Sequence, residues 1–296
     1  MVLCCTGILL LAGCRFEAPD PTKDDKPTQG RVMILADADC RAVVEQELGT
    51  FHAFYRKAEI TVRYLDEGDL LKAMMNDSVR CVITTVEPGR EQDAYYRGRN
   101  ISTPIVPLYR SAIAVVVGPA SRLGPLDVAG VARLLGKAGG TPGADTLQAI
   151  FPGKGSGLAR LLKDSLGIGH MQARALPDIN AVVEQVAQNP RAVGFLPFEA
   201  ISDLDNPSVR ALRERLRLVP VAKVPGGTAV LPSQSTVADG SYPFLRTVHA
   251  IVTEGKSGLG TGFVSFVANH KGQKIILKLG IVPITIPERI IEIVPN

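Results

Sequence analysis

Short apolar runs and helical repeats alternate in the first part of the chain. Residues 31–36, 60–65 and 79–85 are rich in apolar and β-branched side chains, which predicts buried strands. Apolar side chains at helical spacing run from Val44 to Tyr55, and a second helix is expected over 69–76. This alternation predicts a parallel sheet with right-handed crossovers. Ligands bind at the carboxyl ends of such strands, where this chain places Asp37, Ala38, Asp39, residues 67–69 (Glu-Gly-Asp), Thr84 and Thr85.

The same alternation continues over 111–239, which predicts a second α/β unit. Residues 225–240 are rich in glycine, proline and serine and are expected to form a loop. A long helical pattern near the end of the chain has an expected break at 269–272. The other elements are predicted over 112–117 (strand), 128–135 (helix), 179–186 (helix), 192–196 (strand), 218–222 (part of the second unit), 242–252 (strand), 260–279 (helix), 281–284 (extended) and 290–294 (strand).

A glycine-rich loop runs into an amphipathic helix over 151–167. Gly153, Gly155 and Gly157 allow the backbone to approach a ligand closely, and Ser156 is a natural N-cap. The first turn of such a helix offers free N–H groups and a partial positive charge, which suit an anion. The loop lacks the spacing of a nucleotide phosphate loop and of a nucleophile elbow. A capped helix after a flexible turn is the alternative interpretation.

Residues 2–13 form an apolar run that is too short to span a membrane but suits the core of a secretory signal. The tetrapeptide LAGC at 11–14 resembles a bacterial lipobox, although no lysine or arginine precedes it. The resemblance implies cleavage before Cys14 and a lipid on Cys14. Residues 15–30 are rich in proline and charge without periodicity, which predicts a flexible tether. We therefore expect a lipid-anchored, extracytoplasmic protein of the bacterial cell envelope, facing the periplasm or the cell surface.

Composition excludes several function classes. The chain has 296 residues, 46% hydrophobic and 21% charged, which is long enough for two domains. The net charge is +4, but no basic run is interleaved with aromatic residues, so a nucleic-acid partner is not expected. Aromatic residues make up only 5%, so a cleft built on hydrogen bonds and charge is expected. The four histidines are scattered without metal-ligand spacing and no nucleophile–base pair is evident, so we expect no metal, no cofactor and no enzymatic activity.

Two cysteines remain if Cys4 and Cys5 leave with the signal and Cys14 carries lipid. The predicted sheet places Cys40 just past the carboxyl end of one strand and Cys81 at the start of a parallel one. These positions lie at opposite edges of the sheet, farther apart than the ~4.4–6.8 Å between Cα atoms that a disulfide needs. The sequence therefore predicts two free thiols.

Several segments together resemble one family. They are 82–88, 112–117, Gly155–Gly157 before a helix, 192–195, and the closing set Tyr242–Arg246, Gly272–Ile276 and Gly280–Pro283. Over residues 31–285 the chain is similar to phosphate ABC-transporter substrate-binding proteins of the PstS type, within the type II periplasmic binding protein superfamily. The resemblance implies an α/β fold with two lobes around a cleft. It implies a first lobe of 31–110 plus 240–296, a second lobe of 111–239, and two strands that cross between them.

The chain departs from this family at the positions that would bind the anion. Pro152 and Lys154 stand where the family carries arginine and aspartate, and Val86 stands where it carries an acidic residue. Lys154, Arg110 or Arg246 could supply a replacement charge; the alternative is a solvated lysine and two hinge arginines paired with carboxylates. Asp37 and Asp39 could form an acid pair, or they could be two solvated carboxylates in a turn. The candidate ligand-binding set is Asp37, Ala38, Asp39, Thr84, Thr85, Arg110, Lys154, Gly155, Ser156, Gly157 and Arg246.

Two functions follow from these patterns. The first is a lipid-anchored solute-binding protein that captures phosphate or a similar small oxyanion for an ABC permease. The second is a structural or regulatory subunit of a cell-envelope complex that keeps the fold without transport. The retained Gly155-Ser156-Gly157 loop favours the first function, and the lost arginine and acid favour the second.

Overall fold

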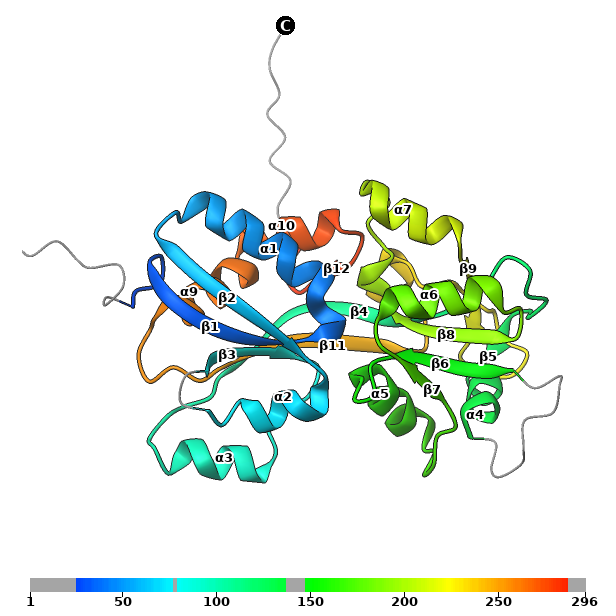
Figure 1. Cartoon of the computed structure of the whole chain (residues 1–296), viewed down its shortest axis with the longest axis horizontal. Helices are drawn as coiled ribbons and strands as arrows, with labels where there is room; N and C mark the ends of the chain where they lie inside the picture. Colours follow the sequence, from blue (N-terminus) through cyan, green and yellow to red (C-terminus); the bar gives the residue numbers. More distant parts are fainter. Residues whose placement is uncertain (1–24, 77–78, 137–146, 287–296) are drawn as a thin grey trace, which may run out of the picture.

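The computed structural model describes residues 25–76, 79–136 and 147–286. Three parallel strands with helices on both faces form the first lobe (Figure 1). In the first strand, Ile34 belongs to the same buried cluster as Phe51, and Leu35 to the cluster of Leu70, because successive side chains of a strand point to opposite faces. The elements of this lobe are β1 (Gly30–Asp37), η1 (Ala38–Cys40), α1 (Arg41–Phe54), β2 (Ala58–Leu65), α2 (Glu67–Ala73), β3 (Val79–Thr84), α3 (Arg90–Arg97), α9 (Leu259–Ala268) and α10 (His270–Lys278).

The second lobe, like the first, is built on three parallel strands. The predicted loop over 225–240 is wrong near its end, since a short helix lies at 234–238. The Ser233 hydroxyl accepts the Thr236 N–H at 3.2 Å and caps that helix, a local signal that the glycine and proline content concealed. The elements are β5 (Leu126–Asp127), α4 (Val128–Gly136), β6 (Gln148–Pro152), α5 (Gly157–Leu166), β7 (Arg174–Leu176), α6 (Ile179–Gln188), β8 (Ala192–Pro197), η2 (Phe198–Ala200), α7 (Pro207–Glu214), β9 (Arg217–Leu218), β10 (Val221–Ala222) and α8 (Gln234–Ala238).

Two long strands cross between the lobes, β4 (Ile105–Val117) and β11 (Leu245–Val252). They pair antiparallel, with Arg246 opposite Ser111, and β4 then continues alongside β8. The resulting sheet has the order β2-β1-β3-β11-β4-β8-β6-β7, with β9 and β12 (Val282–Pro283) also paired to β4. This confirms the predicted two-lobed α/β fold. The exact lobe boundaries stay a prediction, and the one at 110/111 falls inside the continuous strand β4.

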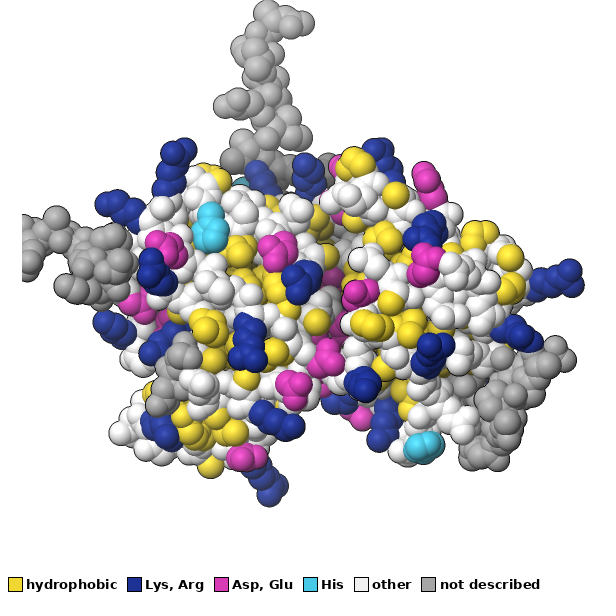
Figure 2. All heavy atoms as spheres, in the orientation of Figure 1, with side chains coloured by type: hydrophobic (Ala, Val, Ile, Leu, Met, Phe, Trp, Pro, Cys, Tyr) yellow, Lys and Arg dark blue, Asp and Glu magenta, His cyan; other side chains and the backbone are white. Residues whose placement is uncertain are grey.

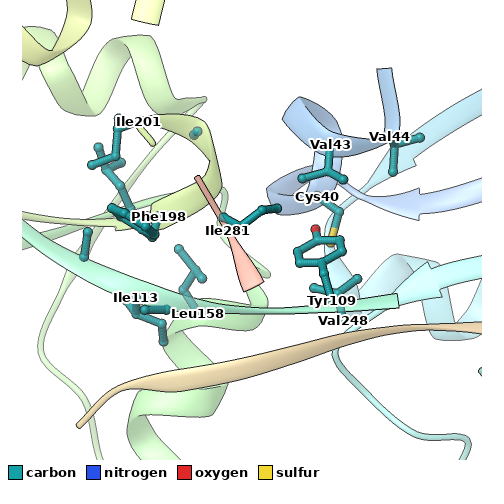
Figure 3. Close-up of a cluster of buried hydrophobic side chains, with 14 of the residues drawn as sticks. Cys40, Val43, Val44, Tyr109, Ile113, Leu158, Phe198, Ile201, Val248 and Ile281 are labelled. Carbon is teal, nitrogen blue, oxygen red and sulfur yellow. The ribbon is translucent and has the colours of Figure 1, made fainter. Parts of the chain in front are cut away.

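One large buried cluster extends through both lobes and the crossing strands (Figure 3). Cys40 and Val43 contribute to it from the first lobe, Leu158 and Phe198 from the second, and Tyr109 from β4. Apolar burial of this kind is the main favourable term in folding. The lobes are therefore joined by packed side chains as well as by backbone.

The last residues of the predicted tether contact the folded first lobe. The Asp25 carboxylate accepts the Leu259 N–H at 2.7 Å and so caps the start of α9. The Pro27 carbonyl lies only 1.8 Å from where a Cβ on Gly262 would stand, so the segment packs directly on α9. The lipobox, Cys14 and the predicted strand over 290–294 lie outside the described residues. Within the described ranges, no helix combines the length and hydropathy that crossing a membrane requires.

Cys40 and Cys81 are both free and fully buried, as predicted. Burial raises the pKa of both thiols, which keeps them protonated and unreactive in the folded protein. We expect iodoacetamide without reductant to label both after unfolding in guanidinium and neither in buffer alone. Peptide mapping by mass spectrometry measures this. An unlabelled pair after unfolding would contradict the separate positions of the two cysteines.

Candidate functional site

The N-terminus of α5 faces the carboxyl ends of the first lobe's strands. The Ser156 hydroxyl accepts the Leu158 N–H at 3.2 Å, which is the predicted N-cap. Gly153 before it has φ +74° and Gly167 at the far end has φ +62°, values that favour glycine. The predicted loop and helix are thus confirmed, and the helix end is presented to the other lobe (Figure 1).

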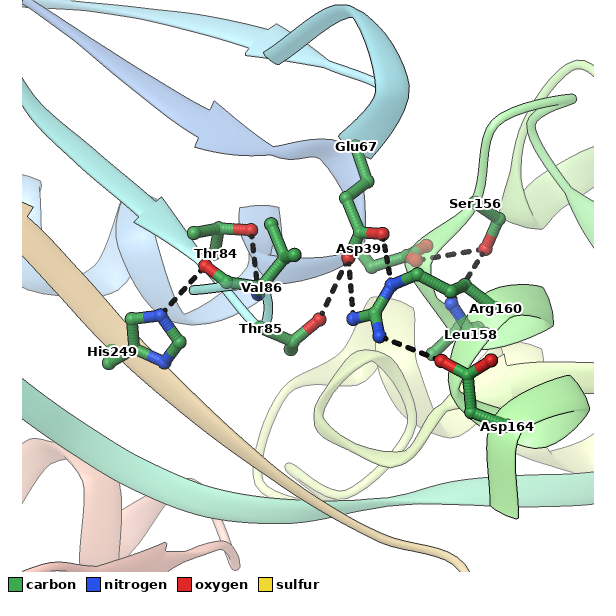
Figure 4. Close-up of polar contacts among 10 residues, drawn as sticks. All are labelled: Asp39, Glu67, Thr84, Thr85, Val86, Ser156, Leu158, Arg160, Asp164 and His249. Atoms are coloured by element: carbon green, nitrogen blue, oxygen red, sulfur yellow. Dashed lines mark hydrogen bonds and ion pairs between the residues drawn. The ribbon is translucent and has the colours of Figure 1, made fainter. Parts of the chain in front are cut away.

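Carboxylates of the first lobe accept hydrogen bonds from this loop (Figure 4). The Gly155 N–H donates to Asp66 Oδ2 at 3.0 Å. The Ser156 hydroxyl donates to Asp39 Oδ2, also at 3.0 Å. Backbone N–H groups and hydroxyls at a helix N-terminus are the donors that bind an oxyanion. In this structure they bind the protein's own carboxylates.

An ion pair between the lobes lies beside these bonds. Arg160 Nε and Nη2 contact Glu67 Oε1 and Oε2 at 2.5 and 3.0 Å, a two-pronged pairing (Figure 4). The Thr85 hydroxyl donates to Glu67 Oε2 at 3.2 Å, and Arg160 Nη1 contacts Asp164 Oδ2 at 3.2 Å. The Glu67 side chain is only 6% exposed. The guanidinium that could bind a ligand is therefore neutralised from across the cleft.

Glycines permit this close approach. A Cβ on Gly157 would lie 2.8 Å from Glu67 Oε2 and 3.0 Å from Asp37 Oδ2. A Cβ on Gly155 would lie 3.1 Å from the Asp66 Cβ. Real Cβ atoms essentially never approach a neighbour within 3.0 Å. The glycines that the sequence suggested for a ligand thus also make room for the other lobe.

Asp37 and Asp39 form a buried acid pair. They are 1% and 5% exposed, so the alternative of two solvated carboxylates is wrong. Burial raises the pKa of Asp37 to about 6. Burial and then the charge of Asp37 raise the pKa of Asp39 to about 8. Asp37 Oδ1 accepts the Asp39 N–H at 3.0 Å, whereas Asp37 Oδ2 has no hydrogen-bond partner among the described residues.

Arg246 lies on β11 beneath this pair and is fully buried. Its Nη2 contacts Glu199 Oε1 at 2.7 Å, and the same carboxylate accepts the hydroxyls of Tyr109 and Ser111 at 3.1 and 2.5 Å. Arg246 Nη2 also contacts the Cys40 sulfur at 3.5 Å, next to Asp39. Within the described part of the chain, Nε and Nη1 of Arg246 have no partner. Arg246 thus agrees with the alternative of a hinge arginine paired with a carboxylate.

The structure brings together only part of the predicted set. Asp37, Asp39, Thr85, Ser156 and Gly157 meet at the cleft, with Gly155 beside them. Lys154 is exposed, which agrees with a solvated lysine. Arg110 donates to the Ala238 carbonyl at 3.4 Å, and Thr84 accepts the Val86 N–H at 3.2 Å within its own loop. Glu67, which the sequence placed at a ligand-binding strand end, pairs here with Arg160, whereas the sequence did not single out Asp66, Arg160 and Glu199.

A groove of about 630 Å³ opens along the same seam, within the volume range of small-molecule sites. Figure 2 shows acidic side chains gathered along the seam between the lobes. The residues that line the groove include the acidic residues Asp39, Glu45, Asp66, Asp178, Glu199 and Asp203, with Ala38 and Arg41. Among the described residues, however, no group of three or more metal-ligating side chains forms a metal site.

Comparison with known proteins agrees with this architecture. Residues 22–271 match the model of the PBP superfamily domain. No curated protein matches the sequence. The fold is similar to a putative phosphate ABC transporter substrate-binding protein with bound phosphate from Clostridium perfringens, with a TM-score of 0.70 and 15% identity over 86% of this chain and all of that one.

Two other solved structures show how widely the fold is used. An ABC-type phosphate transport receptor from Vibrio cholerae has a TM-score of 0.63 and 11% identity over 86% of this chain and all of that one. The CcmR regulatory domain from Synechocystis, in complex with 2-PG, has a TM-score of 0.54 and 14% identity over 81% of this chain and 96% of that one. Identities this low establish the fold alone. The chain therefore belongs to the PBP superfamily and has the type II two-lobed fold of substrate-binding proteins.

Proposed function

We propose that this protein is a lipid-anchored, extracytoplasmic solute-binding protein that captures phosphate or a similar small oxyanion between its lobes and delivers it to an ABC permease. The observation that supports this most is the set of unpartnered polar atoms at the cleft. Asp37 Oδ2, which lies next to Gly157 at the start of α5, and two nitrogens of Arg246 are buried without a hydrogen-bond partner among the described residues. Buried polar groups in this condition suit a bound ligand or water.

The chemistry of these atoms suits an oxyanion. Below about pH 6 the protonated Asp37 carboxyl can donate to one oxyanion oxygen, and the Arg246 nitrogens and Ser156 can donate to the others. The acid pair adds a pH dependence, because the cleft gains negative charge as pH rises through about 6 and about 8. Oxyanion binding should therefore weaken between pH 5.5 and pH 8.5. The LAGC tetrapeptide at 11–14 supports the lipid anchor.

Unfolding of the full-length protein in mild detergent, with and without phosphate or sulfate, tests the ligand. At ~100 times its dissociation constant, a ligand should stabilise the folded state by about 2.7 kcal/mol. S156A should abolish the stabilisation. S233A is the matched control, since it removes the N-cap of α8 in the same lobe, away from the cleft. No stabilisation by either anion at millimolar concentration, at pH 5.5 or 8.5, would refute oxyanion capture.

One observation favours a second candidate, a structural or regulatory subunit of an envelope complex. The donors of the α5 loop are already bound to Asp39, Asp66 and Glu67 of the first lobe. Such contacts would hold the two lobes together in a protein that closes without a ligand. Failure of the oxyanion experiment, with the protein correctly folded, would favour this candidate.

A further inference from the structure

We propose that the first lobe carries an internal latch: the carboxylates of Asp39, Asp66 and Glu67 occupy the anion-binding donors of the second lobe and hold the lobes closed without ligand. The three contacts are Asp39 with Ser156, Asp66 with the Gly155 N–H, and Glu67 with Arg160. The latch itself is independent of the function proposed above. Its consequence, that an entering oxyanion must displace these carboxylates, rests on that function.

Each latch contact joins the two lobes. The bonded residues are 89, 93 and 117 positions apart in sequence, and each pair has one member in 37–67 and the other in 155–160. The three acceptors are carboxylate oxygens, and the three donors are a backbone N–H, a hydroxyl and a guanidinium. This is the donor set that holds a free oxyanion. The carboxyl oxygens thus act as acceptors at the three donors, as the oxygens of an anion would.

The glycines of the loop show that the fit is close. Without a Cβ at Gly157, the carboxylates of Glu67 and Asp37 reach the start of α5. A methyl group there would meet both of them within about 3 Å. In the latched state the acidic side chains therefore lie against the N-terminus of α5, where the partial positive charge of the helix stabilises them.

Hydrogen exchange of the full-length protein in phosphate-free buffer tests the latch directly, because the Gly155 N–H is itself one of the latch donors. We expect slow exchange of the peptide over 153–162 in the unaltered protein. E67Q removes the charge that holds Arg160 and should speed this exchange roughly tenfold, which corresponds to about 1.4 kcal/mol, because charge-assisted hydrogen bonds are lost. E184Q is the matched control, because Glu184 pairs with Arg215 inside the second lobe. It should leave the exchange of 153–162 unchanged.

The G157A variant should also open the latch, by a steric clash instead of a lost charge. Its methyl group should separate the lobes and also speed exchange over 153–162, whereas G49A, which has open space around it, should not. Fast exchange in the unaltered protein, or no acceleration in either E67Q or G157A, would overturn the latch. Phosphate titration of the same samples separates the two proposals. Tighter phosphate binding by E67Q supports displacement, while accelerated exchange without any phosphate binding upholds the latch and refutes oxyanion capture.

Discussion

Replacing Arg246 by glutamine is expected to lower the free energy of unfolding by about 3–5 kcal/mol, the range found when one member of a buried ion pair is removed. Arg246 and Glu199 both have fully buried side chains, with Nη2 and Oε1 2.7 Å apart. R246Q would leave the Glu199 charge in the interior with only the hydroxyls of Tyr109 and Ser111 as donors. Denaturant unfolding of the full-length protein measures the loss.

A double variant tests whether this loss comes from the unpaired Glu199 charge or from lost packing. In E199Q/R246Q neither charge remains, so the double variant should be more stable than the sum of the two single losses predicts, by more than about 1 kcal/mol. R215Q is the control, since its pair with Glu184 is about half exposed and should contribute at most about 1 kcal/mol. Strict additivity of the two single losses would contradict an ion pair that acts as a unit.

This pair also joins three parts of the molecule. Glu199 follows β8 in the second lobe, Arg246 lies on a crossing strand, and Arg246 Nη2 reaches Cys40 in the first lobe. Both crossing strands pass this point, β11 with Arg246 and β4 with Ser111, so the ion pair ties Glu199 of the second lobe to both strands.

Local patterns were sufficient for most of the fold. The runs at 31–36, 60–65 and 79–85 became β1, β2 and β3. Most residues of β3 and the second half of β1 are buried, whereas the edge strand β2 buries only alternate residues near its start. The cap at Ser156 and the stop at Gly167 depend only on neighbouring residues, and both were predicted correctly. The predicted break in the last helical stretch is also present, at Asn269, which ends α9 and caps α10.

The candidate site could be predicted only in part, because its contacts are between lobes. Glu67 was expected at a ligand-binding strand end before the second helix, but α2 begins at Glu67, and its side chain pairs with Arg160 in the other lobe. No pattern within one segment indicates a partner 93 residues away. Asp37 and Asp39 were open to two interpretations for the same reason, since their burial requires the second lobe to cover them.

Replacing Glu47 by glutamine is expected to stabilise the protein by about 3 kcal/mol at pH 7, an unusual direction for a change in a buried residue. Glu47 lies on the inner face of α1, is 1% exposed, and neither carboxylate oxygen has a partner among the described residues. Burial raises its pKa from 4.5 to about 9. A folded-state pKa above the unfolded value means that stability is fully present below about pH 4.5 and is lost as pH rises toward 9.

Glutamine resembles the protonated acid in size and polarity but cannot ionise in the unfolded chain. At pH 7 the 2.5 units between the pH and the unfolded pKa correspond to about 3 kcal/mol at 1.36 kcal/mol per unit. E47Q and the unaltered protein should therefore unfold alike at pH 4, and their difference should grow steadily up to pH 9. E45Q, at an exposed position two residues earlier, should stay within about 0.5 kcal/mol at every pH. Denaturant unfolding at pH 4, 7 and 9 measures this, and a pH-independent difference for E47Q would mean that Glu47 is paired or hydrated in solution.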